Sequence, residues 1–331
     1  MKKNTKKILF AAGLGAAGAA AIHAAHRYVS EYLMKIAFNR DLPEKVEKEQ
    51  QKRAASGNLS EHTMLVLDAS KKLENKSLEV VQIESHDGLE LVGHWYCPEN
   101  PKRVIVAMHG WRSTWAQDFG TIAPFWFEND CAVLFAEQRG QGNSGGEYMG
   151  FGLLERYDCL NWINWVNERT EGYLPIYLGG VSMGASTVLM TAGLELPDTV
   201  KGIIADCGFT SPEAIGKHVV ENKFRIPYSL HSAAVNDICE NKMQAGPANY
   251  SCADALQNSK VPVLFIHGTD DDFVPVEMTY ENYKACNAPK HLLIVPGAKH
   301  GMSYLVDQAA YEKEVMAFWN QYDEGDIFAD M

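Results

Sequence analysis

The sequence predicts an α/β fold in which a mostly parallel sheet is covered by helices on both faces. Three observations lead to this prediction. From about residue 78 onward, short apolar runs alternate with segments of helical length, the runs are apolar at nearly every position, and the residues able to do chemistry follow such runs. Near-continuous apolar strands are typical of parallel sheets buried on both faces. Ligands of these sheets bind beyond the carboxyl ends of the strands.

The expected elements begin with a hairpin. Residues 78–83 and 89–96 alternate apolar and polar side chains on either side of the turn sequence His86-Asp87-Gly88. Buried strands are then expected at 104–108, 132–136, 176–178, 202–205, 261–266 and 292–295. Segments of helical length, such as 153–167 and 182–194, separate most of these strands. The body of the protein is therefore expected to cover residues 78–322.

One interval interrupts this alternation. Residues 209–260 mix apolar side chains with turn formers, and they lie between the sixth strand and the next one. A loop of this length without secondary structure is improbable. We therefore expect a helical cap inserted over the active site, with apolar residues such as Phe209 and Phe224 lining a substrate pocket.

The ends of the chain differ from the body. Four lysines precede an apolar run rich in alanine and glycine, from Ile8 to Ile22, which is the layout of a signal peptide or signal anchor. We expect residues 1–26 to anchor the chain in a membrane, with the body of the protein outside the cytoplasm. A cleaved, secreted protein and a cytoplasmic protein with an alanine-rich packed helix are the alternatives. Residues 27–77 are interpreted as a polar helical linker, and residues 323–331 as an acidic tail.

Composition excludes several classes of protein. The 331 residues are 46% hydrophobic and 22% charged, which is enough apolar material for a globular core. The net charge of −12 and the lack of a basic stripe argue against binding to nucleic acid. The seven cysteines are scattered without a Cys-x-x-Cys pair, so neither a zinc site nor another metal or organic cofactor is expected. Cys239 and Cys252 could form a disulfide in an oxidising compartment. The sequence does not indicate an oligomeric state.

The most informative motif is Gly180-Val181-Ser182-Met183-Gly184. It lies where an apolar run meets a segment with a helical pattern, and G-x-S-x-G at such a turn is the signature of a nucleophile elbow. The turn is so sharp that the central residue is strained and the flanking positions need small residues. Because glycine and serine are common, the motif alone is not specific, and its value depends on its partners.

A serine nucleophile needs a base, and the base needs an orienting carboxylate. With an elbow serine the partners follow in the order acid, then histidine. Only His291 and His300 lie beyond every plausible acid. His291 begins a predicted strand, whereas His300 lies in the loop that follows it, so His300 is the predicted base. The run Asp270-Asp271-Asp272 after strand 261–266 leaves the choice of acid open, and Asp206 is a weaker rival.

Four stretches together resemble the serine α/β-hydrolases. Besides the elbow, they are His109-Gly110-Trp111, Gln138-Arg139-Gly140-x-Gly142-x-Ser144 and His267-Gly268-x-x-Asp271-x-x-Val274-Pro275. The likeness covers about residues 78–322 and is nearest to the subgroup related to serine aminopeptidases and small esterases. It implies the α/β-hydrolase fold, a cap after the sixth strand, and Asp271 as the triad acid. Gln138 departs from the aspartate of many relatives, and we expect this to change only local hydrogen bonding.

The resemblance also implies an oxyanion hole made of two backbone N–H groups. Met183, which follows the nucleophile, supplies one, and Trp111 supplies the other. Trp111 and Trp115 are then expected to stand beside the substrate pocket. His109 and His267 are expected to hold loops by hydrogen bonds and not to bind a metal.

The resulting expectation is a serine hydrolase that cleaves carboxylic esters of small to medium, apolar substrates through an acyl-enzyme. A serine peptidase or aminopeptidase acting on short peptides is the alternative within the same chemistry, and thioesterase and acyltransferase activities would use the same residues. A non-catalytic binding module tethered to a membrane is the alternative from a different class, but the filled triad positions argue against it.

Overall fold

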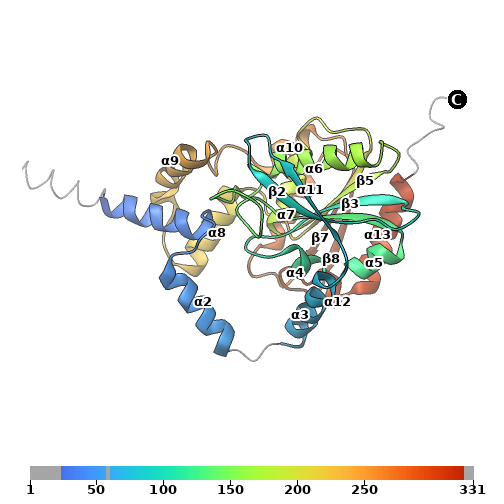
Figure 1. Cartoon of the computed structure of the whole chain (residues 1–331). Helices are drawn as coiled ribbons and strands as arrows, with labels where there is room; N and C mark the ends of the chain where they lie inside the picture. Colours follow the sequence, from blue (N-terminus) through green and yellow to red (C-terminus); the bar gives the residue numbers. More distant parts are fainter. Residues whose placement is uncertain (1–23, 57–59, 324–331) are drawn as a thin grey trace, which may run out of the picture.

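The computed structural model of the chain describes residues 24–56 and 60–323 (Figure 1). Its centre is one sheet of eight strands in the order β1-β2-β4-β3-β5-β6-β7-β8. Only β2 runs antiparallel to its neighbours, and the other pairs are parallel, so the predicted, mostly parallel sheet is confirmed. The strands are β1 Glu79–Glu84, β2 Glu90–Tyr96, β3 Arg103–Met108, β4 Cys131–Ala136, β5 Ile176–Val181, β6 Val200–Asp206, β7 Val263–Gly268 and β8 Lys290–Val295.

Alternate residues of each strand feed two hydrophobic cores, one on each face of the sheet. Along β3, Val104 and Val106 face one core, while Ile105 and Ala107 face the other. The first core is covered by α6 (Glu155–Arg169), α7 (Met183–Thr191), α10 (Cys252–Asn258) and α11 (Val276–Ala285). The second is covered by α3 (Glu61–Glu74), α4 (Trp115–Phe119), α5 (Ala123–Glu128), α12 (Ser303–Val306) and α13 (Gln308–Tyr322). Strands buried on both faces explain why their sequences are apolar almost throughout.

The insertion after β6 is helical, as expected, but its last helix belongs to the body. The cap consists of α8 (Pro212–Lys223), a short 3-10 helix (Tyr228–Leu230) and α9 (Ser232–Met243). In contrast, α10 buries Cys252 and Leu256 in the first core, which places this helix on the sheet. The expected end of the cap at residue 260 is therefore too late, because apolar spacing alone does not tell whether a helix packs on a cap or on a sheet.

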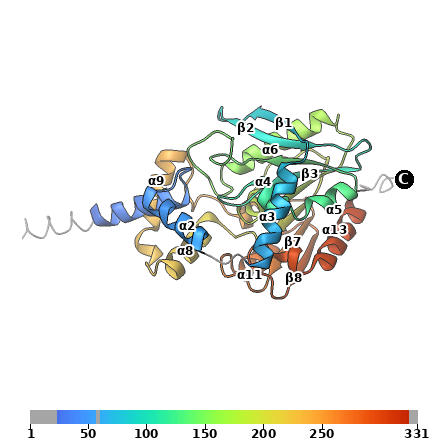
Figure 2. The same ribbon diagram turned by 60° about the horizontal axis from the view of Figure 1, so that its bottom comes forward.

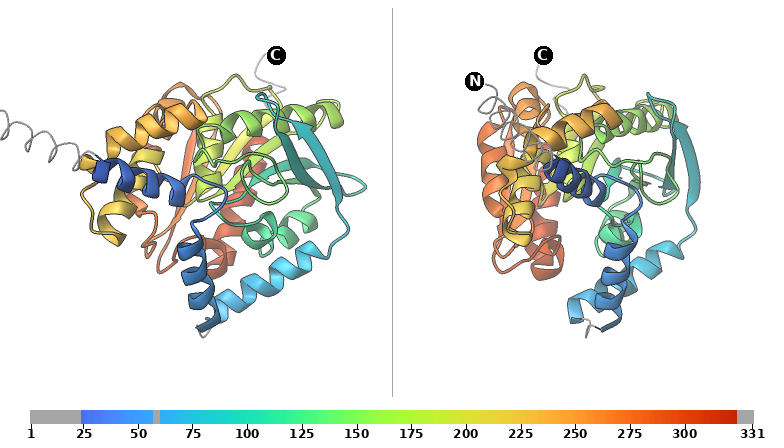
Figure 3. Two further views of the ribbon diagram at one scale, coloured as in Figure 1. Left: turned by 60° about the vertical axis from the view of Figure 1, so that its left-hand side comes forward. Right: turned by 90° about the vertical axis from the view of Figure 1, so that its left-hand side faces the viewer.

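The described part of the segment interpreted as a linker, residues 27–77, is mostly helical, but much of it packs on the body. A helix covering residues 24–37, which we call the N-terminal helix, lies beside the cap in all views (Figures 1–3). Met34 and Phe38 are buried there against Val235 and Ile238 of α9. Farther along, α3 crosses α4 (Figure 2) and buries Leu73 in the second core.

Only α2 (Glu44–Ser56), between these two packed segments, fits the solvated helix expected from the charge run. Its described side chains are mostly exposed, and Lys48 pairs with Glu44 on the surface. The remainder of the segment differs from a spacer because apolar residues recur at helical intervals in it, and such a stripe must be buried.

The two chain ends lie mostly outside the described residues. Residues 1–23 of the expected anchor are among those not described, and in the described part no helix is both long and apolar enough to cross a membrane. At the other end, Asp323 belongs to the body and not to a free tail, because its carboxylate pairs with the buried guanidinium of Arg103. Cys239 and Cys252 are both buried and unpaired, so the disulfide that we considered is not formed.

Candidate active site

The elbow places Ser182 between β5 and α7 in a strained backbone conformation. Its φ of 55° and ψ of −117° lie in a region that a residue with a side chain rarely adopts. The flanking glycines are required by contact, because a Cβ on Gly180 would overlap the backbone of Gly184, and a Cβ on Gly184 would overlap the carbonyl of Met108. The turn that the motif predicted is therefore present, and it leaves the serine hydroxyl clear of the sheet.

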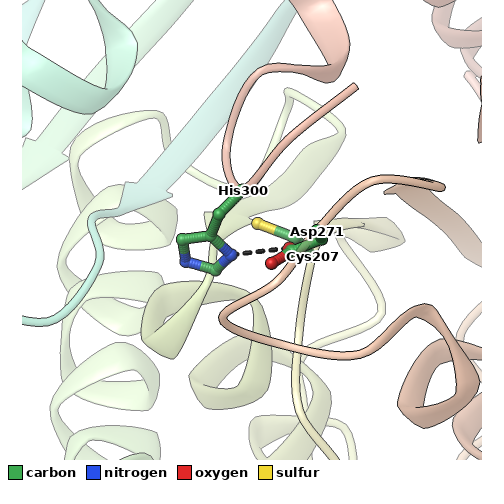
Figure 4. Close-up of side chains that lie close together, drawn as sticks. All are labelled: Cys207, Asp271 and His300. Atoms are coloured by element: carbon green, nitrogen blue, oxygen red, sulfur yellow. Dashed lines mark hydrogen bonds and ion pairs between the residues drawn. The ribbon is translucent and has the colours of Figure 1, made fainter. Parts of the chain in front are cut away.

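The structure brings Ser182, His300 and Asp271 together from three separate loops. His300, after β8, lies with Nε2 2.9 Å from the Ser182 hydroxyl and with Nδ1 2.7 Å from Asp271 Oδ2. Figure 4 shows the second of these contacts, between the imidazole and the carboxylate of the loop after β7. The Asp271 side chain is fully buried, whereas 26% of the His300 side chain remains exposed. This geometry allows the imidazole to accept the hydroxyl proton while the carboxylate fixes its orientation.

Asp271 is held as a carboxylate by the groups around it. Burial on its own would raise the pKa of Asp271, but hydrogen bonds from His267 and His300 outweigh that effect and leave the pKa well below its usual value. The other oxygen, Oδ1, accepts from the backbone N–H groups of Phe273 at 2.9 Å and Val274 at 2.8 Å. An ionised acid in this place stabilises the imidazolium that forms when the serine loses its proton.

The structure also separates Asp271 from the other candidate acids. Asp270 and Asp272 are exposed, and Asp272 makes only a long surface contact of 3.9 Å with Lys223. Asp206 is buried but accepts its hydrogen bond from Ser303 at 3.1 Å and not from the imidazole. Of the four aspartates that the sequence left open, Asp271 alone contacts His300.

The two histidines expected to hold loops do so, and one of them also touches the acid. His109 is buried, its Nδ1 lies 2.8 Å from the Gly110 carbonyl, and its Nε2 accepts from the Gln138 N–H at 3.2 Å. Burial lowers the pKa of His109, which fits this neutral, twice-bonded ring. His267 Nε2 lies 3.1 Å from Asp271 Oδ2, and its Nδ1 lies 2.7 Å from the Thr279 hydroxyl. The contact between His267 and Asp271 was not foreseen, although the four-residue spacing of the two in one motif was a signal for it.

Two backbone N–H groups beside Ser182 are available to an oxyanion. Met183 begins α7, so its N–H has no acceptor in the preceding turn of the helix. Gly110 lies against Ser182, where a Cβ on the glycine would be 3.4 Å from the serine Cβ. The N–H groups of Gly110 and Arg112 donate to Asp118 and Gln141, both at 2.6 Å. Trp111, between them, has no such acceptor among the described residues, which leaves its N–H free for a ligand.

Two neighbouring cavities lie in this part of the molecule, and one of them reaches the serine. A cavity of about 350 Å³ contains Ser182 and His300 in its lining. A second cavity, of about 100 Å³, has a lining without a charged side chain and includes Phe224 of the cap. Trp111 and Phe273 line both cavities, so they form the boundary between them.

Two of the residues expected in the pocket are placed elsewhere. Trp115 is wrong as a pocket residue, because it stacks on His94 with ring centroids 4.1 Å apart and packs against Phe135 in the second core. Its position at the start of α4 turns the indole toward the sheet. Phe209 is buried behind the apolar cavity, where it packs on Phe151, which does line the cavity.

Cys207 lies close to the acid and the base (Figure 4), and these three side chains offer possible ligand atoms within 4.8 Å of one another. A metal would require the thiolate. Burial raises the pKa of the Cys207 thiol well above its usual value, and Asp271 and His300 already bond to each other. The donor set therefore does not suit a metal, and we interpret Cys207 as a packing residue.

Comparison with known proteins agrees with this geometry. The model of the prolyl oligopeptidase family matches residues 117–325. The uncharacterized protein YqkD of Bacillus subtilis is 28% identical over 261 residues, which cover 78% of this chain and 84% of YqkD. The uncharacterized protein YfhR of Escherichia coli K12 is 25% identical over 232 residues, which cover 68% of this chain and 74% of YfhR.

Solved structures show the same α/β-hydrolase fold. The Pyrococcus furiosus esterase Pf2001 superposes with a TM-score of 0.62 at 21% identity, over 80% of this chain and 95% of the esterase. The Pyrococcus horikoshii acylaminoacyl peptidase superposes with a TM-score of 0.54 at 19% identity, over 76% of this chain but only 43% of the peptidase. These likenesses establish the fold, and the site itself must indicate the reaction.

Proposed function

We propose, from the premise that this chain belongs to the prolyl oligopeptidase family, that it hydrolyses carboxylic esters with small to medium apolar acyl groups. Membership follows from a family match over more than half of the chain, and it makes the chain a serine hydrolase of the peptidase and esterase type. The observation that carries the finer proposal is the apolar cavity that shares Trp111 and Phe273 with the cavity at Ser182 and whose lining has no charged side chain.

The proposed reaction proceeds through an acyl-enzyme. Ser182 Oγ attacks the carbonyl carbon as His300 accepts its proton, and the Met183 and Trp111 N–H groups stabilise the oxyanion. His300 then protonates the leaving alcohol as the carbon–oxygen bond breaks. In the second half, His300 removes a proton from water, the hydroxide adds to the acyl carbon, and Ser182 leaves with the proton returned. Asp271 keeps the imidazole in the tautomer that both halves require.

The polarity of the cavities favours an ester over a peptide. An aminopeptidase must bind a free ammonium group, for which a carboxylate near the scissile bond is the usual partner. Asp118, the acidic residue that lines the catalytic cavity, is occupied by the Gly110 N–H and the Ser113 hydroxyl. The neighbouring apolar cavity offers no charged group either. The likeness to an esterase is consistent with this choice.

A peptidase remains the second candidate because the fold is shared with an acylaminoacyl peptidase and with the family as named. An N-acylated amino acid carries no ammonium group, so the shortage of carboxylates does not argue against it. The same triad would cleave its amide bond, with the amine protonated by His300.

A substrate comparison tests the proposal. The full chain is assayed on p-nitrophenyl butyrate, on aminoacyl p-nitroanilides and on N-acetyl-aminoacyl p-nitroanilides, with Ser182→Ala as the control. We expect kcat/KM on the ester to exceed that on either amide series and to vanish in Ser182→Ala. Faster cleavage of an amide series would move the assignment to a peptidase. Ester turnover that survives Ser182→Ala would refute the nucleophile.

We also propose that residues 1–26 anchor the protein in a membrane, with the catalytic body on the outer side. The support is the lysine-rich head and apolar run of the sequence. Carbonate extraction of membranes from cells that make the full chain should leave it in the pellet, and protease added to intact spheroplasts should degrade it. Release of the full chain by carbonate would contradict the anchor.

A further inference from the structure

The apolar cavity lies between the cap and the N-terminal helix. One wall comes from the N-terminal segment through Leu33, Ile36 and Phe38, and the opposite wall comes from α8 through residues such as Val219. The helix and the cap lie side by side in the views of Figures 1 and 3. A segment that precedes the hydrolase body in sequence therefore completes a cavity that adjoins the one containing the nucleophile.

The wall formed by the N-terminal segment is held in place by the oxyanion loop itself. The Arg112 guanidinium donates to the carbonyls of Arg40 at 2.9 Å, Ile36 at 3.1 Å and Asn39 at 2.5 Å. The neighbouring Trp111 indole donates to the Ala37 carbonyl at 2.8 Å. Carbonyls at the end of a helix otherwise lack partners, so these bonds fix the end of the N-terminal helix to the loop that carries an oxyanion donor.

A second attachment joins the middle of the same helix to the cap. The Ser30 hydroxyl lies 3.1 Å from His231 Nδ1, and both residues are buried. Between the two attachments, Met34 and Phe38 pack on α9. Because the helix is attached at Ser30 and at its C-terminal end, the side chains of Leu33 and Ile36 have a defined position relative to the body, which a loose linker would not give them.

We propose that this cavity binds the acyl chain of the substrate and that the N-terminal helix sets the length of chain accepted. The inference rests on the proposed ester hydrolysis. A cavity of about 100 Å³ has room for roughly three water-sized groups at about 30 Å³ each, which corresponds to an acyl chain of about four carbons with its carbonyl at the serine. The chain enters the cavity beside Trp111 and Phe273, which line both cavities and stack on each other with ring centroids 6.5 Å apart.

The position of Met183 indicates that this cavity holds the acyl part of the substrate and not the alcohol part. Met183 follows the nucleophile, and it packs in one cluster with Trp111, Phe273 and Ile215, which all line the apolar cavity. The remaining space of the catalytic cavity is bounded by more polar groups such as Gln117 and Thr121. The leaving alcohol, which must depart before water enters, occupies this more polar space.

The test narrows the cavity from each wall in turn. The full chain and its Ile36→Trp and Val219→Trp variants are assayed on p-nitrophenyl acetate, butyrate, hexanoate and octanoate. Lys35→Trp and Lys217→Trp are the matched controls, because these side chains are the exposed neighbours on the same helices. A buried methylene is worth about fourfold in binding. Butyrate has two methylenes more than acetate, so we expect the butyrate-to-acetate ratio of kcat/KM to fall at least tenfold in both cavity variants and to stay at the wild-type value in both controls.

The outcomes separate this inference from the proposed function. Ester turnover with an unchanged chain-length ratio in both cavity variants, each with a cooperative thermal transition, would overturn the inference alone. A second series uses butyrate esters of alcohols of increasing length. If kcat/KM in the two cavity variants changes only along this series, the inference is overturned too, because the cavity would then hold the alcohol. Absence of ester turnover in the wild-type protein would contradict the proposed function and the inference with it.

Discussion

Asp206 is a buried acid beside the candidate active site, and its replacement by asparagine should stabilise the protein above neutral pH. The residue is only 4% exposed, and its carboxylate accepts a hydrogen bond from Ser303 and lies within hydrogen-bonding reach of the Tyr311 side chain. Burial raises the pKa of Asp206 to about 6, although the charge of His267 and the bond from Ser303 act in the opposite direction. At higher pH the protein therefore keeps a poorly solvated negative charge in its interior.

The sign and size of the effect follow from proton binding. The unfolded chain ionises Asp206 near the ordinary pKa of 3.8, whereas the folded protein keeps the proton until about pH 6. Between these values the folded state binds more protons, so its stability falls as the pH rises. A difference of about 2 pKa units, at about 1.4 kcal/mol each, amounts to on the order of 3 kcal/mol. This cost is fully present above about pH 7 and absent below about pH 3.

Urea unfolding followed by tryptophan fluorescence at pH 4 and pH 8 measures this difference. Asp206→Asn removes the charge and keeps an oxygen that can accept from Ser303, so its free energy of unfolding should exceed that of the wild type by about 2–3 kcal/mol at pH 8. The gain should be much smaller at pH 4. Asp198→Asn, at an exposed acid, controls for the change in net charge. A loss of stability in Asp206→Asn that is equal at both pH values would refute the reasoning.

Three further substitutions test other parts of the structure. Arg112→Met removes three guanidinium bonds to carbonyls of the N-terminal segment, and the free energy of unfolding in urea should fall by about 3 kcal/mol; no loss would mean that these bonds are not formed in solution. Gly184→Ala introduces a Cβ that overlaps the Met108 carbonyl, so little soluble protein should be recovered, and a normal yield with a normal melting temperature would contradict the elbow geometry. Asp271→Asn should lower kcat by about 10⁴-fold, which is the loss that a wrong imidazole tautomer causes in serine proteases. The control Asp272→Asn should keep a kcat near that of the wild type. The reverse result would assign the role of the acid to Asp272.

Much of the fold could be predicted from sequence because its signals are local. A strand buried on both faces must be apolar along its length, so the strands of the parallel sheet were visible as short runs, within a few residues of their ends. Ser182, Asp271 and His300 follow β5, β7 and β8, whose carboxyl ends share one edge of the sheet. Their convergence follows from the topology, which the chain order of the motifs already indicated.

The features that were missed depend on contacts between segments distant in sequence. The sequence around Trp115 does not indicate that the indole stacks on His94 of β2 and not on a substrate. The packing of the N-terminal helix depends on Arg112, which lies more than seventy residues later and binds carbonyls that have no side-chain signal. The charge run in α2 favoured the interpretation of the whole segment as a solvated linker. The apolar stripe of Leu33, Met34 and Phe38 was the local signal that part of the segment is buried.

The central claim is that Ser182 is a nucleophile activated by His300, and covalent labelling tests it most directly. The full chain is treated with a fluorophosphonate probe, digested, and examined by mass spectrometry. We predict one modified peptide, carrying the probe on Ser182, and loss of that modification in His300→Ala. Failure of Ser182 to react in folded wild-type protein, or equal labelling after the histidine is removed, would contradict the account.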